Sequence, residues 1–213
     1  MNVGRRMSHP VITVHPDVPI TKAHELMAHE NIGQMPVVKN GKLVGIVSEN
    51  DILKAYPSSV TSLAVWEIAA LIEKINVKNV MIKTVKTVQE GTLIEEAARI
   101  MVDNEISSLP VMRGTELVGI ITQTDLFNIM LEMLGARRPG VHFSVLISPK
   151  PGTMAKITKA IYENGGDLTA LSVFEGDSAA NFMLSAKVDG IEQKTLQKLL
   201  KPFVIALVEI GTN

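Results

Sequence analysis

The sequence predicts an α+β protein made of two copies of a β-α-β-β-α unit followed by one β-α-β-β-α-β unit. Two observations carry this prediction. Residues 3–55 align with residues 77–129 without a gap, and sixteen aligned positions are identical. After residue 135 a different alternation of strand and helix patterns begins, which predicts a separate domain. Units that combine helices with adjacent, hairpin-connected antiparallel strands belong to the α+β class.

Each copy is expected to begin with a short β-branched strand, which an amphipathic helix and a strand pair follow. The expected strands are Val11–Val14, Pro36–Lys39 and Leu43–Ser48 in the first copy, and Val85–Val88, Pro110–Met112 and Leu117–Thr122 in the second. Asn40 and Gly41, between two of these strands, form a strong hairpin signal. A unit of roughly 50–55 residues is marginal alone. We therefore expect the copies to pack face to face as a pseudo-symmetric pair.

The bulk composition is that of a packed globular protein. Of the 213 residues, 46% are hydrophobic and 20% are charged, and the mean hydropathy is +0.22. The net charge is −1 without a long basic tract, so nothing favours nucleic acid or an anionic membrane as a partner. The chain contains no cysteine, which excludes disulfides and cysteine-based metal sites and fits a cytoplasmic location.

The segment that connects the two copies, residues 61–75, is predicted to be an apolar helix with Ser62 as its N-cap. Its polar side is narrow, which indicates burial on more than one side. Two interpretations stay open. The helix packs within its own subunit, or it forms a subunit interface together with the methionine-rich helix of residues 125–134.

The same string, glycine, two hydrophobic residues, a hydroxyl residue, two spacers and aspartate, ends both copies. It places Ser48 before Asp51 and Thr122 before Asp125, at the start of a helix. One interpretation is a capping box, in which the hydroxyl and the carboxylate begin the helix. The other is a nucleoside site, where the carboxylate accepts hydrogen bonds from two ribose hydroxyls and the helix N-terminus favours phosphate. The two roles are compatible at one residue.

This duplicated unit with its closing motif resembles the CBS domain, and the tandem pair resembles a Bateman module. The resemblance covers roughly residues 1–135. We divide the chain into a first CBS repeat (1–60), a linker helix (61–76), a second CBS repeat (77–136) and a C-terminal domain (140–213). The resemblance implies two clefts between the repeats that bind AMP, ADP, ATP, S-adenosylmethionine or a related adenosine ligand.

The resemblance also implies which residues line each cleft. Thr122 and Asp125 are expected to face Ser8, Ile12, Gln34 and Met35, and Ser48 and Asp51 are expected to face Lys86, Ser108 and Leu109. Relatives that sense nucleotides often carry an arginine where this chain has Gln34 and Ser108. That departure favours an adenosine ligand with less charge than a polyphosphate.

The last third of the chain resembles the ACT domain. Strands are expected at residues 141–147, 168–174, 181–188 and 204–210, and helices at residues 153–164 and 191–201, which is the ferredoxin-like β-α-β-β-α-β order. The resemblance implies dimerisation and an amino acid at the interface, with Gly152 and Asp167 as candidate ligand residues. The alternative is that this domain only assembles subunits.

No enzyme motif and no metal site stand out. The sequence lacks a glycine-rich dinucleotide loop, a P-loop and a nucleophile elbow, and His24 and His29 do not have the spacing that puts two ligands on one helix face.

The whole arrangement is similar to the acetoin utilisation protein family, which implies regulation without implying acetoin as the ligand. We therefore predict a homodimeric, non-catalytic regulator that binds an adenosine nucleotide and carries no cofactor. The alternative is a constitutive oligomeric scaffold.

Overall fold

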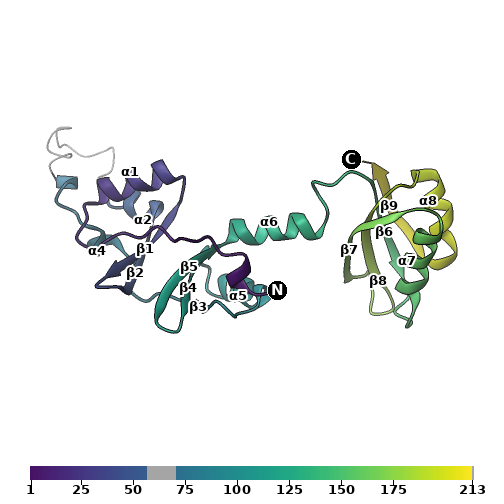
Figure 1. The fold of residues 1–213 in the computed structure, drawn as a ribbon, viewed down its shortest axis with the longest axis horizontal. Helices are drawn as coiled ribbons and strands as arrows, with labels where there is room; N and C mark the ends of the chain where they lie inside the picture. The colour runs from purple at the N-terminus through teal and green to yellow at the C-terminus, as the bar shows by residue number, and fades with distance from the viewer. Residues whose placement is uncertain (57–70, 213) are drawn as a thin grey trace. The chain divides into compact units, whose positions relative to one another are not determined.

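The computed structural model describes residues 1–56 and 71–212, and the chain divides into two compact units (Figure 1). The first unit is Met1–Leu126 and the second is Phe127–Asn213. Both combine helices with strands, so the α+β class predicted from the sequence is confirmed. Residues 61–70, the larger part of the predicted linker helix, lie outside the described residues.

The first unit contains both copies of the repeat. The first copy contributes η1 (Val3–Arg5), α1 (Ile20–Glu30), β1 (Gln34–Lys39), β2 (Lys42–Ser48) and α2 (Glu49–Leu53). The second copy contributes α4 (Val77–Val80), β3 (Val88–Gln89), α5 (Ile94–Asp103), β4 (Ser108–Arg113), β5 (Glu116–Thr122) and the start of α6 (Gln123–Met133), which continues into the second unit from Phe127. The β-α-β-β-α order predicted for the repeat is present in the second copy from β3 onward, whereas in the first copy the predicted first strand is reduced to a single bridge at Val14.

The strand pairs of the two copies match closely, whereas the first strand of each copy is shorter than predicted. β1 pairs with β2 and β4 with β5, both antiparallel. Asn40 and Gly41 join the first pair with φ values of 52° and 73°, as a two-residue hairpin turn requires. Only Val14 forms a bridge to β1 in the first copy, and β3 has two residues.

Each copy sends a segment across to the last strand of the other copy. Ile82 exchanges two backbone hydrogen bonds with Ile46 of β2, at 2.9 and 3.0 Å. Ser8, which aligns with Ile82, exchanges two with Ile120 of β5, at 2.9 and 3.2 Å. These crossed connections hold the repeats as one unit, since neither copy supplies both sides of its own bridge.

Glycine at position 45 permits this crossing. A methyl group on Gly45 would lie 2.7 Å from Met81 Sδ and 3.0 Å from the carbonyl oxygen of Ile82. The matching glycine of the second copy, Gly119, faces Met7 Sδ and, at 3.1 Å, the carbonyl oxygen of Ser8. A side chain at either position would push the crossing segment away, so the glycine of the shared motif serves the packing of the repeats.

Each repeat has its own hydrophobic core. In the first repeat, Ile20, Met27, Val37 and Ile52 are completely buried between the helices and β1–β2. The second repeat buries the corresponding faces of α5, β4 and β5. The two aspartate motifs lie at the ends of β2 and β5, so these cores fix the position of the motifs.

The second unit is a four-stranded antiparallel sheet with two helices. Its elements are β6 (Val141–Ile147), α7 (Thr153–Glu163), β7 (Asp167–Glu175), β8 (Phe182–Asp189), α8 (Gln193–Leu200), η2 (Lys201–Phe203) and β9 (Ala206–Thr212). The sheet order is β7-β8-β6-β9, and α7 and α8 cover one face of the sheet (Figure 1). The β-α-β-β-α-β order predicted from the sequence is present.

Across both units, none of the helices among the described residues is long and apolar enough to cross a membrane.

We expect Gly45→Ala to lower the free energy of unfolding by about 1–3 kcal/mol, because the new methyl group overpacks the crossing segment at Met81 and Ile82. Chemical denaturation of both variants and the wild type measures this change. The control is Gly91→Ala, where a methyl group meets no atom within 4 Å. Equal stability of the two variants would contradict the role assigned to Gly45.

Candidate functional site

The turn from β2 into α2 holds Ser48 and Asp51 together. Ser48 ends β2 with an extended backbone (φ −107°, ψ 160°) and is the N-cap of α2. The backbone N–H of Asp51 donates to Ser48 Oγ at 3.1 Å, and the backbone N–H of Ser48 donates to Asp51 Oδ2 at 2.9 Å. This capping box supplies acceptors for two N–H groups at the start of the helix.

The turn from β5 into α6 repeats this arrangement. The backbone N–H of Asp125 donates to Thr122 Oγ1 at 3.2 Å, and the backbone N–H of Thr122 donates to Asp125 Oδ2 at 2.8 Å. The capping interpretation of the shared motif is therefore realised in both copies. Whether the same residues also bind a ligand depends on the groups that the cap leaves available.

The cap occupies one oxygen of each carboxylate. The hydroxyls of Ser48 and Thr122 also donate to Asp51 Oδ2 and Asp125 Oδ2, at 2.6 and 2.7 Å. Within residues 1–56 and 71–212, the other oxygen, Oδ1, of each aspartate makes no hydrogen bond. An ionised carboxylate has about four acceptor positions, so each aspartate keeps acceptor capacity for a ligand hydroxyl.

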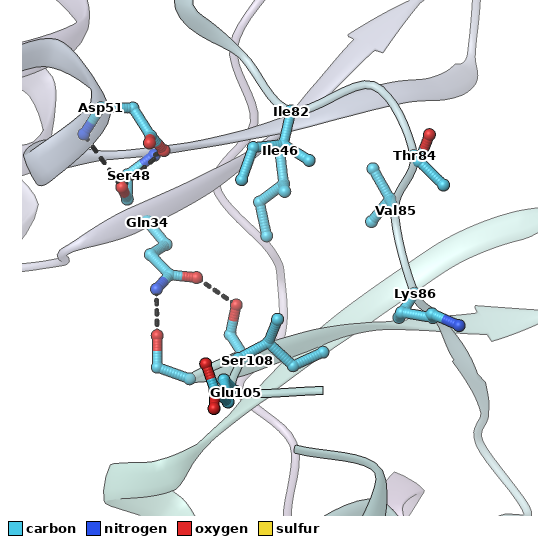
Figure 2. Close-up of a pocket in the computed structure, with 12 residues that line it drawn as sticks. Gln34, Ile46, Ser48, Asp51, Ile82, Thr84, Val85, Lys86, Glu105 and Ser108 are labelled. Atoms are coloured by element: carbon cyan, nitrogen blue, oxygen red, sulfur yellow. Dashed lines mark hydrogen bonds between the residues drawn. The ribbon is translucent and has the colours of Figure 1, made fainter. Parts of the chain in front are cut away.

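A pocket of about 190 Å³ opens beside the motif of the first copy, with walls from both repeats (Figure 2). Its polar and charged lining residues are Gln34, Ser48, Asp51, Thr84, Lys86, Glu105, Ser107 and Ser108. Its apolar lining residues are Ile46, Ile82, Val85 and Ile106. A pocket with a carboxylate at one end and aliphatic walls offers both a polar anchor and an apolar contact to a small molecule.

The amide of Gln34 joins the two repeats at this pocket. Its Nε2 donates to Ser107 Oγ, and its Oε1 accepts a hydrogen bond from Ser108 Oγ (Figure 2). Gln34 lies opposite Ser48 in the β1–β2 register, and Ser108 lies opposite Thr122 in the β4–β5 register. Gln34 and Ser108 occupy equivalent positions of the repeat, so their hydrogen bond links the two motifs across the pair.

Several residues assigned from the sequence meet at this pocket. Lys86 and Ser108 line it together with Ser48 and Asp51. Gln34 lines it too, although the sequence analysis placed this residue opposite Thr122 and Asp125.

The other assigned residues lie elsewhere. Met35 and Leu109 are completely buried, in the cores of the first and second repeat. Ile12 packs against the first core, and Ser8 pairs with β5 two residues before Thr122. Ser8 and Ile12 align with Ile82 and Lys86, which line the first pocket. Their role in a second, equivalent site stays a prediction.

Sequence reasoning missed part of the pocket wall. Ile82, Thr84 and Val85 come from the segment that crosses between the repeats, and Glu105 and Ser107 from the turn before β4. No motif marks these positions. The CBS resemblance already implied that Lys86 and Ser108 face Asp51, and the course of the crossing segment adds further residues from the same copy to the pocket wall.

The charges around this pocket are mixed. In the part of the chain that the structure describes, its lining contains one lysine, Lys86, and two carboxylates, Asp51 and Glu105. Glu105 is exposed and has a positive φ of 53°, at the end of the turn that precedes β4. In the described residues, no group of three or more histidine, aspartate or glutamate side chains is placed to hold a metal ion.

The two candidate residues of the C-terminal unit do not meet within one chain. Gly152 is the N-cap of α7 with a φ of 85°, whereas Asp167 begins β7 after the other end of that helix. An α-helix of 11 residues is about 16 Å long. A small ligand in contact with both residues would therefore have to take one from each of two subunits.

Comparison with known proteins gives a consistent picture for the first unit. A model of the CBS domain matches residues 3–58 and 77–132. Inosine-5′-monophosphate dehydrogenase of Thermoplasma acidophilum is 37% identical over 117 residues, which are 54% of this chain and 21% of that enzyme. Uncharacterized protein MJ1426 of Methanocaldococcus jannaschii is 31% identical, with 59% of this chain and 88% of that protein covered. This chain thus spans about a fifth of the dehydrogenase.

Solved structures resemble the same region. The CBS domain pair of protein MJ0100, in complex with 5′-methylthioadenosine and S-adenosyl-L-methionine, has a TM-score of 0.52 and 28% identity and covers 65% of this chain and 98% of that one. A candidate acetoin utilization protein (AcuB) from Vibrio cholerae has a TM-score of 0.53 and 30% identity, with 64% and 95% covered.

We expect Thr122→Val to lower the free energy of unfolding by about 0.5–2 kcal/mol without any ligand, because valine cannot accept the hydrogen bond from Asp125 N–H. Thermal and chemical unfolding measure the change. Thr87→Val, at an exposed threonine in the same repeat, is the matched control and should be near neutral. A neutral Thr122→Val would show that the cap contributes nothing to stability.

Proposed function

The chain belongs to the CBS domain family, and on this basis we propose that it is a non-catalytic regulatory protein that binds an adenosine-type ligand between its two CBS repeats. A CBS domain pair is a regulatory module, and the related pair of MJ0100 was solved with two adenosine derivatives. In this chain, the proposal is supported by Asp51, because the two oxygens of its carboxylate have different surroundings. One carboxylate oxygen caps α2, and the other faces no partner in the described residues.

The available oxygen suits a ribose. The vicinal 2′- and 3′-hydroxyls are both donors, and a carboxylate accepts more than one hydrogen bond at an oxygen. Hydrogen bonds to an ionised acceptor are roughly twice as strong as neutral ones. Because the cap fixes the Asp51 side chain before any ligand arrives, binding does not have to order that side chain again.

The rest of the pocket suits an adenine base. Ile46, Ile82, Val85 and Ile106 supply aliphatic contacts for the faces of the ring. The volume of about 190 Å³ is below the range of about 300–1,000 Å³ for drug-sized ligands. We expect the nucleoside to occupy the pocket and its 5′ substituent to extend towards solvent.

The charges favour a ligand with little negative charge. Among the described residues that line the pocket, Asp51 and Glu105 outnumber Lys86, and none is an arginine. A triphosphate would bring several negative charges close to two carboxylates. We therefore rank S-adenosylmethionine and 5′-methylthioadenosine above AMP, and AMP above ADP and ATP.

The hydrogen bond between Gln34 and Ser108 supports communication between the two motifs. A ligand at Asp51 would contact Gln34, whose partner Ser108 lies opposite Thr122. A ligand shifts a conformational equilibrium only as far as its affinities for the two states differ. Ligand binding would regulate by changing the relative arrangement of the two repeats. A partner protein in the cytoplasm would then bind one arrangement in preference to the other.

The C-terminal unit is proposed to be an ACT domain that assembles the protein as a homodimer. Its β-α-β-β-α-β order supports this assignment, as does the glycine with positive φ at the start of α7, Gly152. Asp167 and Gly152 of two subunits would form the amino-acid site, if the domain binds a ligand as well as assembling subunits.

The outer side of α6 supports a homodimer. Phe127, Met130 and Met133 are 61%, 46% and 61% exposed, whereas Ile129 on the same helix is buried. Exposed aromatic and methionine side chains in a row are typical of protein interfaces. This observation favours the interface interpretation of the methionine-rich helix.

We expect Asp51→Asn combined with Asp125→Asn to weaken binding of S-adenosylmethionine or 5′-methylthioadenosine at least about tenfold, with the fold intact. The asparagine oxygen keeps the cap, and its NH₂ group replaces the oxygen that would accept the ribose. Isothermal titration calorimetry measures affinity, and thermal unfolding measures stability. Asp51→Ala with Asp125→Ala should lose both binding and the cap.

Asp103→Asn, at an exposed aspartate of α5, is the matched control and should bind as the wild type does. Unchanged affinity in the double asparagine variant would show that the assigned site is wrong. If no adenosine ligand binds the wild type, the alternative of a constitutive scaffold holds.

We expect Phe127→Lys combined with Met133→Lys to raise the dissociation constant of the homodimer, because two charges would have to be buried in the α6 part of the interface while the C-terminal unit still associates. Light scattering after size-exclusion chromatography at several protein concentrations measures the share of dimer. Asn128→Lys, on the other side of α6, is the control and should leave that share unchanged. A double-lysine variant that dimerises as tightly as the wild type would exclude this helix from the interface.

A further inference from the structure

The sheet of the C-terminal unit has a second face, which carries polar side chains. Val141, Phe143 and Val145 of β6 are buried against α7 and α8, so His142 and Ser144 point to the other face. The strand register extends this polar face to the neighbouring strands. His142 lies opposite Lys187, and Ser144 lies opposite Ser185.

Lys187 is the exceptional residue of this face. It is only 3% exposed, and its Nζ donates to the carbonyl oxygen of Gly135 at 3.3 Å. In the described residues, no carboxylate lies within 4.0 Å of this ammonium group. An ammonium group has three N–H donors, so one carbonyl leaves most of its hydrogen-bonding capacity unused. Burial of a charge without a counter-ion is costly.

A cavity of about 230 Å³ lies at Lys187. Its polar lining is Lys187, His142, Ser172 and Ser185, and its apolar lining includes Leu134, Ala136 and Ala170. Ser172 lies opposite Ser185 across β7 and β8, and Ser185 Oγ accepts from Ser144 Oγ at 3.2 Å. Two hydroxyls therefore stand beside the buried ammonium group, with small apolar side chains around them.

The loop that ends the cavity is fixed by close packing. Gly135 has a φ of 62°, and a methyl group there would lie 2.9 Å from the Cβ of Ala170. The Gly135 carbonyl also accepts from the backbone N–H of Arg138 at 3.0 Å. The loop is thus seated on the sheet, and its carbonyl offers Lys187 one neutral acceptor and no counter-charge.

We propose that this cavity binds the carboxylate group of a small molecule, with Lys187 as the cationic partner and Ser172 and Ser185 as hydroxyl donors. One ammonium group matches the single negative charge of a carboxylate. A phosphate with two charges is usually held by several cations or by arginine. His142 Nε2 already has an acidic partner 3.4 Å away, the largely exposed carboxylate of Glu209, which does not line the cavity.

The size and walls of the cavity narrow the ligand class. A volume of about 230 Å³ is smaller than that of pockets for drug-sized molecules, and Leu134, Ala136 and Ala170 contact an aliphatic chain better than a polar one. The ligand is therefore a short-chain aliphatic acid or hydroxy acid. Gly152 and Asp167 do not line this cavity, so the site is separate from the predicted amino-acid site.

The test is calorimetric titration of the full chain with sodium butyrate, sodium lactate and sodium phosphate, against sodium chloride at equal ionic strength. We expect butyrate or lactate to bind more tightly than phosphate. Lys187→Met should weaken carboxylate binding at least about tenfold, because methionine has a similar length and no charge. Lys194→Met, at an exposed lysine of α8, is the matched control and should bind as the wild type does.

A second variant keeps the lysine and fills the cavity. Ser172→Leu should abolish butyrate binding, because the leucine side chain would occupy the cavity. If circular dichroism shows that Lys187→Met does not fold, this variant alone tests whether the cavity binds a carboxylate. The NMR signal of the Lys187 ε-methylene in ¹³C-lysine-labelled protein should shift with butyrate and not with chloride. The proposal is overturned if no carboxylate binds, if phosphate binds more tightly, or if both variants bind as the wild type does. Because Asp51 and Asp125 are untouched, these results do not depend on the nucleotide proposal.

Discussion

The hydrogen bonds that Asp51 and Asp125 receive from their own capping boxes fix the functional geometry of the CBS pair. Each carboxylate gives one oxygen to a backbone N–H and a hydroxyl at the end of a strand. This arrangement starts a helix and directs the carboxylate without a ligand. The same motif can therefore cap a helix and bind a ligand. The cap positions the group that a ribose would use.

The segments that cross between the two repeats form the pocket wall around this motif. Ile82 and Ser8 pair with the last strand of the opposite copy, and the glycines at positions 45 and 119 leave room for them. Residues 82–86 thereby come to lie beside Asp51, and the Gln34–Ser108 hydrogen bond spans the pair. A ligand in such a pocket contacts both repeats at once, which is the physical requirement for a sensor whose output is their relative arrangement.

Much of this could be predicted from the sequence, because duplication and hairpin signals are local. The gap-free repeat predicted the element order, and Asn40-Gly41 predicted the turn that the structure contains. The strands at Val11–Val14 and Val85–Val88 were overestimated, since β-branched residues favour extended backbone whether or not a partner strand is in reach. Gln34 was assigned to the opposite groove, and Glu105 was missed, because both placements depend on how the repeats cross. The buried Lys187 gave no sequence signal either, since its burial and its contact with Gly135 depend on packing between segments far apart in the chain.

We propose that the capped aspartate holds a ribose through its remaining oxygen. A crystal structure of the chain with 5′-methylthioadenosine would give the distance from Asp51 Oδ1 to the ribose hydroxyls. We expect about 2.5–2.8 Å, with the Ser48–Asp51 cap unchanged. Electron density for the ligand away from Asp51, or a ribose with no hydrogen bond to this carboxylate, would contradict it.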